Sequence, residues 1–267
     1  MDLDFEKWFT AMQNRRSRRT FISKQLEPTT LEIVKQVIEE LNKLHSEVRL
    51  VLVEEAPDEL LIGTVGPYGR ITGALAYVAV VCDHSSDYSY ERGGYIGQAI
   101  VLEASSNGLS SCWIGGYFNS ELATKKLSVQ EKEAVMAIIP IGYARKNYSL
   151  TEKMMNQASE YHKRKPIRKI VSGLPMEEWP NWIEASIQAA SLAPSAYNRQ
   201  PFEYIIGTDH SITIVIEKPD QETKIRKEID LGIVMLHIEL TAKHYHIKGE
   251  WEFKESEKQI IFREMTS

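Results

Sequence analysis

Apolar residues recur with a helical period in two segments near the start of the chain. Their spacing over residues 5–12 predicts an amphipathic helix that ends at a cluster of arginines. Residues 27–44 predict a second helix, in which Thr29 and Glu32 form a capping-box pattern after Pro28 and a stripe of leucine, isoleucine and valine follows. The chain therefore begins with two helices, each with one face to bury.

Continuous apolar runs predict strands further along. Residues 48–55 are strand-like, and residues 74–83 are apolar enough for a central strand covered on both faces. A glycine-rich loop separates them. A long helix is predicted from about Gly94 to the stop signal at Asn107 and Gly108, and residues 134–144 predict another buried strand. Helices and strands thus interleave.

A polar, basic segment at residues 145–169 leads to a second half that resembles a faint copy of the first. Aligning residues 94–113 with residues 232–251 without a gap pairs Gly94 with Gly232 and Trp113 with Trp251. Any two amphipathic helices followed by a strand can be aligned in this way, so chance and internal duplication both stay open. The tryptophan-bearing strand after each helix favours duplication, by which one chain would reproduce a two-subunit arrangement.

Composition narrows the classes of protein. The chain has 267 residues, 43% of them hydrophobic, and a net charge of -5, which describes a globular protein and disfavours a general nucleic-acid binder. Cys82 and Cys112 lack spaced cysteine or histidine partners, so we expect two core thiols in a reducing compartment. Without a signal-peptide core or a run of membrane-spanning length, a cytoplasmic protein with no membrane partner is expected.

Two polar motifs allow a binding or a purely structural interpretation. The stretch "QNRRSRRTF" at residues 13–21 is either a solvated basic helix end or an anion site built from exposed guanidiniums. The stretch "SLAPSAYNRQPFEYII" at residues 191–206 is either an ordinary helix-to-strand connection or a rigid loop that binds a flat polar ligand. In the second case Ser195 and Asn198 would supply hydrogen bonds beside Pro194.

Four segments together, "RRSRRTF", "SSCWIGGYFN", "IIPIGYARK" and "APSAYNRQPFEY", resemble the nitroreductase family of FMN-dependent flavoenzymes. The resemblance implies an α+β fold of three layers, with mixed, mainly antiparallel sheets flanked by helices. In ordinary members the Pro-Ser-Asn-Gln-Pro loop follows the arginines early in the chain, whereas here it comes after Pro180. This order is typical of a fused subgroup, with a first half at residues 1–165 and a degenerate second half at residues 166–267 that supplies the loop.

The resemblance also implies roles for particular residues. Arg15, Arg16 and Ser17 would hold the FMN phosphate and ribityl chain, Arg19 would reach the pyrimidine ring, and Arg18 would face away. Arg70 would lie near flavin N1 and O2. Backbone N–H groups of Gly115 and Gly116 would meet N5 and O4, and Arg164 would close on the phosphate. From the second half, the residues expected to line the flavin are Pro194, Ser195, Ala196 and Asn198.

The implied activity is a ping-pong reaction in which NADH or NADPH reduces FMN and a small-molecule electron acceptor, such as a nitroaromatic compound or a quinone, reoxidises it. The flavin would carry the chemistry, so no catalytic protein residue and no metal are expected. A flavin carrier or sensor without turnover and a flavoenzyme with a more specialised substrate stay open. A monomer would suffice if the two halves form the family's interface internally, and a homodimer is also compatible.

Overall fold

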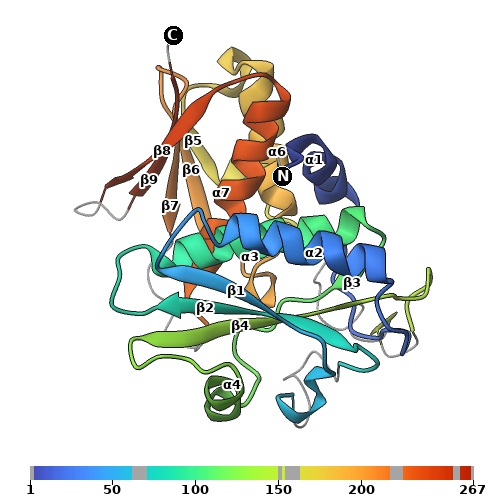
Figure 1. Cartoon of the computed structure of the whole chain (residues 1–267). Helices are drawn as coiled ribbons and strands as arrows, with labels where there is room; N and C mark the ends of the chain where they lie inside the picture. Colours follow the sequence, from blue (N-terminus) through green and yellow to red (C-terminus); the bar gives the residue numbers. More distant parts are fainter. Residues whose placement is uncertain are drawn as a thin grey trace.

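Two sheets, with most of the helices packed between them, form the structure (Figure 1). The computed structural model describes residues 3–61, 71–149, 152–153, 163–216, 225–254 and 259–265. Its main elements are α1 (Phe5–Asn14), α2 (Pro28–Leu41), β1 (Val48–Val53), β2 (Ala76–Asp83), α3 (Ser89–Ser106), β3 (Ser110–Ser111), α4 (Ser120–Lys126), β4 (Glu133–Gly142), β5 (Val171–Gly173), α6 (Asn181–Leu192), β6 (Phe202–Ile206), β7 (Ile212–Ile216), α7 (Lys227–His244), β8 (Gly249–Lys254) and β9 (Gln259–Glu264). Short 3-10 turns occur at Pro57–Glu59, Ile167–Lys169, Met176–Glu178 and Ala196–Asn198.

The first sheet has the strand order β1-β2-β4-β3, and all of its pairings are antiparallel. Every residue of β2 is buried, as the sequence predicted for a central strand. Val78 and Val80 face the helices α2 and α3, whereas Tyr77 and Val81 face a smaller apolar cluster on the side of α4. Alternation along one strand therefore serves two cores.

The second sheet has the order β5-β6-β7-β9-β8. The short strand β5 runs parallel to β6, and the other neighbours are antiparallel. Trp182 of α6 and Trp251 of β8 both contact Phe262 of β9, with ring centroids 6.2 Å and 5.0 Å away. These aromatic rings fix the helix against the sheet.

The two halves share one connectivity. The first half contains α2, β1, β2, α3, β3 and β4 in this order, with the additional helix α4 between β3 and β4, and the second half contains α6, β6, β7, α7, β8 and β9 in this order. The strand orders also correspond, because β1-β2-β4-β3 matches β6-β7-β9-β8 position by position. The observed fold is thus the mixed α+β arrangement that the sequence predicted.

Helices α3 and α7 pack directly against each other between the sheets, and two glycines allow their approach. A Cβ on Gly94 would clash with the backbone carbonyl of Ile229, and a Cβ on Gly232 would clash with that of Glu91. The contact is reciprocal, since Gly94 and Gly232 are equivalent in the ungapped alignment, and Glu91 and Ile229 pair when that alignment is extended by three residues toward the N-terminus. Small residues let two helix backbones come unusually close.

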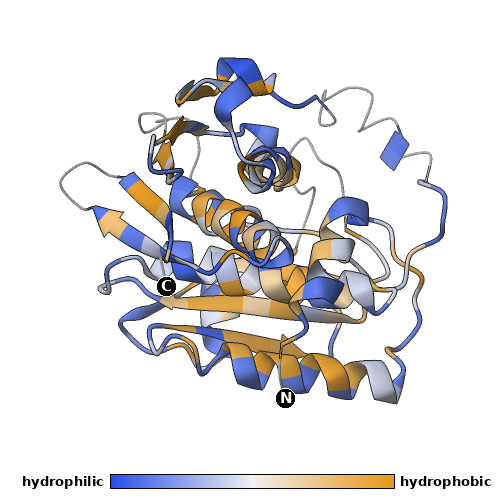
Figure 2. Cartoon of the chain, turned by 90° about the horizontal axis from the view of Figure 1, so that it is seen from above, coloured by the Kyte–Doolittle hydropathy of each residue, from blue (hydrophilic) through white to orange (hydrophobic). Residues whose placement is uncertain are grey.

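The largest hydrophobic core joins the halves. It contains residues of α1, α2 and α3 together with residues of α6 and α7, so it does not divide at residue 165. Figure 2 shows hydrophobic residues concentrated in the strands and inner helices and hydrophilic residues in the loops. None of the helices in the described ranges is long and apolar enough to cross a membrane.

One predicted helix start and one predicted helix cap were wrong. Helix α3 begins at Ser89, five residues before Gly94, because its glycines serve close packing and do not mark a boundary. Helix α2 begins at Pro28 with Glu27 as its N-cap and has no side-chain capping bond, so Thr29 and Glu32 do not form a capping box. Proline at the first helical position needs no N–H partner and presets the helical φ. The helix therefore begins at Pro28 and not after Thr29.

Candidate functional site

A pocket of about 390 Å³ lies between the halves. Its lining residues come from the arginine segment, the loop after β3, Tyr148, Arg164, the loop after α6 and the start of α7. The volume is within the range of small-molecule sites. Ten of the twelve predicted site residues line it, namely Arg15, Arg16, Ser17, Arg19, Gly115, Arg164, Pro194, Ser195, Ala196 and Asn198. Gly116 does not line the pocket, and Arg70 lies outside the described residues.

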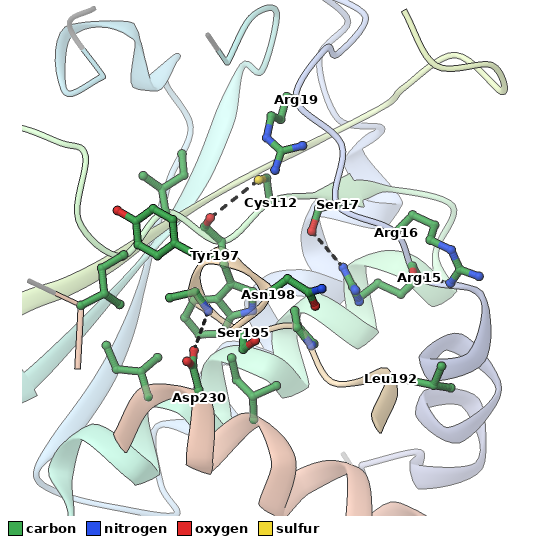
Figure 3. Close-up of a pocket in the computed structure, with 18 of the residues that line it drawn as sticks. Arg15, Arg16, Ser17, Arg19, Cys112, Leu192, Ser195, Tyr197, Asn198 and Asp230 are labelled. Carbon is green, nitrogen blue, oxygen red and sulfur yellow. Dashed lines mark hydrogen bonds between the residues drawn. The ribbon is translucent and has the colours of Figure 1, made fainter. Parts of the chain in front are cut away.

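Backbone hydrogen bonds position the arginine segment. Helix α1 ends at Asn14, and the Arg15 N–H donates to the Ala11 carbonyl at 2.9 Å before the chain becomes extended. The Arg18 N–H then donates to the Ser111 carbonyl at 2.9 Å, beside β3. These contacts place Arg15, Arg16, Ser17 and Arg19 along the pocket (Figure 3).

Arg18 differs from its neighbours because it does not line the pocket. Its Nε donates to a carboxylate oxygen of Glu152 at 3.1 Å, and both side chains are buried. The same carboxylate accepts backbone N–H groups of Arg19 and Ser149, both at 2.9 Å. Burial alone would raise the pKa of Glu152, but these hydrogen bonds outweigh it and lower the pKa to about 2.

Arg15 is buried, which overturns the expectation that the pocket arginines are exposed; Arg16 is exposed as expected. The Arg15 Nη1 donates to Ser17 Oγ at 3.3 Å, whereas its Nε is buried and has no hydrogen-bond partner among the described residues. Burial, together with the positive charges of Arg164 and Arg16, lowers the pKa of Arg15 to about 10. The pocket therefore gathers cationic groups whose repulsion an anion would relieve.

Arg16 and Arg164 complete this end of the pocket. The Arg16 Nη1 donates to the Arg15 carbonyl at 2.8 Å, at the end of α1. Burial and the charge of Arg16 lower the pKa of Arg164. The Arg164 guanidinium donates to Asn198 Oδ1 and, at 3.2 Å, to the Leu192 carbonyl. A cation of the first half is thereby held by the loop of the second.

The loop after α6 is fixed by its own hydrogen bonds. The Gln200 N–H donates to Ser195 Oγ at 3.0 Å, and the Asn198 Nδ2 donates to the Lys163 carbonyl at 2.9 Å. Tyr197, Asn198 and Gln200 have φ angles of 56°, 53° and 46°. Non-glycine residues in the left-handed region are uncommon and concentrate at functional sites. Its hydrogen bonds and its left-handed residues thus hold the loop in one defined conformation at the pocket.

Asp230 of α7 closes the base of the pocket beside this loop (Figure 3). One carboxylate oxygen accepts the Ala196 N–H at 3.0 Å, and the other accepts the Arg199 Nε at 2.8 Å. Burial raises the pKa of Asp230 to about 6, against the opposing effect of Arg199. The carboxylate thus ties α7 to the loop.

The loop after β3 forms the opposite wall. Gly115 lines the pocket, and a Cβ on the adjacent Gly116 would lie 2.8 Å from the side chain of Ile225. Trp113 also lines the pocket, and its Nε1 donates to Gln98 Oε1 at 3.0 Å. The Gln98 Nε2 contacts His237 Nε2 at 3.0 Å, so this buried network joins α3 to α7.

Sequence reasoning did not assign several lining residues to a site. Ile225, Ile229 and Ile233 recur at intervals of four and line the pocket, but the same spacing is typical of a helix face turned to the core. Cys112 was predicted as a core residue; it is buried and also lines the pocket. The sequence around Asp230 contains no motif that marks it as a site residue, because its hydrogen-bond partners lie in the distant loop after α6.

The arrangement suits a ligand with an anionic end and a flat, mainly apolar body. Arginines lie at one end, and isoleucines and Trp113 cover much of the remaining wall. No group of three or more histidine, cysteine or acidic side chains that could hold a metal ion occurs in the described part of the chain.

Comparison with known proteins gives the family. Residues 7–242 match a family model described as "Putative TM nitroreductase". The chain belongs to this nitroreductase family. A crystal structure of a nitroreductase-family protein from Thermotoga maritima shares its fold, with a TM-score of 0.61 and 21% identity over 96% of this chain and 92% of that one.

Other nitroreductase structures are more distant. A nitroreductase family protein from Clostridium difficile has a TM-score of 0.45 and 19% identity, covering 64% of this chain and 97% of its own. An FMN-dependent nitroreductase from the same organism has a TM-score of 0.42 and 20% identity, covering 58% and 96%. No curated protein matches the chain.

Proposed function

We propose that this chain is an FMN-dependent NAD(P)H oxidoreductase that reduces nitroaromatic compounds, quinones or similar acceptors. One observation carries the proposal: Arg15, Arg16 and Arg164 meet at one end of a pocket of suitable size, and the Arg15 Nε is buried without a partner among the described residues. A phosphate would satisfy that donor and neutralise the mutual repulsion that lowers the pKa of Arg15. Membership of the nitroreductase family supports FMN as the source of the phosphate.

The residues present fit FMN. Arg15, Arg16 and Arg164 would bind the phosphate, Ser17 the phosphate or ribityl chain, and Arg19 the pyrimidine ring. When bound, FMN would supply the redox chemistry, accepting hydride from NADH or NADPH and passing electrons to the acceptor.

The protein's own groups would hold and shield the ring. Gly115 would offer a backbone N–H with no side chain in the way, and Gly116 lets this loop approach Ile225 of the second half. Pro194, Ser195 and Ala196 would line the ring from the other side. Asn198 would act partly through Arg164, because its carbonyl oxygen already accepts a hydrogen bond from that guanidinium.

We also infer that the chain is an internally duplicated pseudo-dimer. The matching strand orders, the reciprocal packing of Gly94 and Gly232, and a pocket with walls from both halves support this inference. A single copy would then hold a complete site, and a monomer would be sufficient for activity.

Binding of FMN and of riboflavin, which lacks the phosphate, tests the carrying observation. Arg16→Gln and Arg15→Gln should weaken FMN binding about tenfold to hundredfold, the range for a charge-assisted hydrogen bond, and should leave riboflavin affinity nearly unchanged. Arg168→Gln, on an exposed turn outside the pocket, is the matched control. Equal losses for both flavins would refute a phosphate site.

Activity is tested by the visible absorption spectrum of the FMN-loaded protein during anaerobic addition of NADH or NADPH. Bleaching of the flavin bands would support the oxidoreductase and identify its electron donor. A second candidate is an FMN carrier or sensor without turnover. The Tyr117 and Tyr197 hydroxyls are hydrogen-bonded to each other at the pocket, and two bulky rings held there would block the nicotinamide. Bound flavin that neither nucleotide bleaches would support that candidate instead.

A further inference from the structure

Two tyrosines from opposite halves meet at the pocket. Tyr117 follows the glycines of the first half, and Tyr197 belongs to the loop after α6. The Tyr197 hydroxyl donates to the Tyr117 oxygen at 2.6 Å, and the ring centroids lie 6.4 Å apart with an interplanar angle of 76°. Both rings line the pocket, and Tyr117 is 39% exposed, so the pair lies at its solvent side.

The Tyr197 side of this pair is preorganised. Its backbone has a left-handed conformation, with φ 56° and ψ 18°. The residues on either side are anchored, since the Ala196 N–H binds Asp230 and the Asn198 side chain binds Arg164. A donor held in this way directs its hydrogen bond at one place without losing further conformational entropy.

The direction of the hydrogen bond has a chemical consequence. Because the Tyr117 oxygen accepts from Tyr197, its own proton is available to another acceptor, and no described residue takes it. A hydroxyl that already accepts a hydrogen bond is also a stronger donor. The complementary ligand group is an oxygen on a flat molecule, such as a quinone carbonyl or a nitro group.

We propose that Tyr117 is a specificity-determining residue that donates a hydrogen bond to an oxygen of the electron acceptor, and that Tyr197 orients and strengthens that donor. The proposal rests on the proposed function, whose pocket it uses. In this proposal Tyr117 of the first half contacts the acceptor, and Tyr197 of the second half positions the Tyr117 hydroxyl.

Steady-state kinetics with two flat acceptors test the pair. Menadione offers carbonyl oxygens, whereas N-methylphenazinium has none. Tyr117→Phe should raise KM for menadione about two- to tenfold, the range for one net hydrogen bond, and leave KM for N-methylphenazinium unchanged. Tyr197→Phe should raise it less, and should add nothing when Tyr117 is already phenylalanine. Tyr245→Phe, an exposed tyrosine outside the pocket, is the control.

Equal shifts for both acceptors would overturn the proposal, since they would indicate a change in pocket shape. Additive effects of the two substitutions would also overturn it, because Tyr197 would then act independently of Tyr117. Failure of the proposed function is recognised separately, by wild-type protein that binds no FMN or is not reduced by NADH or NADPH. In that event, quenching of protein fluorescence by menadione still tests the contact, with weaker binding expected for Tyr117→Phe and unchanged binding counting against it.

Discussion

The crossing of α3 and α7 predicts that two glycines cannot be replaced even by alanine. In an isolated helix, alanine is favoured over glycine by about 1 kcal/mol. At Gly94 and Gly232 the added Cβ would lie closer than 3.0 Å to a carbonyl of the facing helix, whereas ordinary contact begins at 3.4 Å. Because the obstacle is backbone, the helices themselves would have to separate.

The cost can be set against the gain in helix propensity. Overpacking typically costs 1–3 kcal/mol, and a gap of ~0.5–1 Å already loses a quarter to a half of each dispersion contact across an interface. Between two buried helices we expect the upper end of that range, so each substitution should lower the free energy of unfolding by about 2 kcal/mol net. For a chain of this size the melting temperature should fall by about 4–8 °C.

The neighbouring Gly93 provides the matched control. It lies in the same helix and would gain the same propensity, but its Cβ would meet the Cys82 and Met136 sulfur atoms at 2.6 Å, and these side chains can rotate away. Thermal unfolding followed by circular dichroism should therefore rank Gly93→Ala well above Gly94→Ala and Gly232→Ala. If the latter two melt at or above the wild-type temperature, the reciprocal close packing is refuted.

Two further predictions concern buried charge. The pKa of His237 is lowered to about 3 because burial disfavours the charged ring, so below pH 6.5 the unfolded state binds a proton that the native state does not. The contribution of His237 to native stability should therefore fall as the pH falls from about 6.5 toward 3, by about 2 kcal/mol at pH 5, whereas the raised pKa of Asp230 acts in the opposite direction. Urea unfolding at pH 7.5 and pH 5 should therefore change the free energy of unfolding of the wild type and of His237→Gln by amounts that differ by about 2 kcal/mol, with the wild type less stable at pH 5 than the variant's change predicts, and equal changes in both proteins would contradict the assignment. Glu152→Gln should weaken FMN binding several-fold by loosening the arginine segment, with the exposed Glu131→Gln as control, and unchanged affinity would show that the segment is held without this carboxylate.

The long elements could be predicted from the sequence because periodicity and apolar runs report burial directly. Strand β2 is one example, since a run with both faces apolar can only be central. Helix starts were less predictable. A glycine inside α3 has the same local signal as a glycine at a boundary, and only the facing helix distinguishes them.

The candidate site was predictable where it consists of sequence motifs. The arginine segment and the displaced loop are recognisable as short stretches, although only the folded chain brings them to one pocket. Their supports were not predictable. Glu152 pairs with Arg18 across 134 positions, and the burial of Arg15 depends on packing from several elements. No local pattern contains such information.

The pocket has walls that the chain encodes at separate places. In a symmetric homodimer every substitution appears in both subunits and changes both sites together. Here residues 15–19 and residues 194–198 each occur once beside the pocket, so a substitution in either segment changes one wall of one pocket and is not repeated in a second copy. The turn after α2 occupies the place in the connectivity that the loop after α6 occupies in the second half, but it does not line the pocket, so the pocket makes no direct demand on which residues it contains.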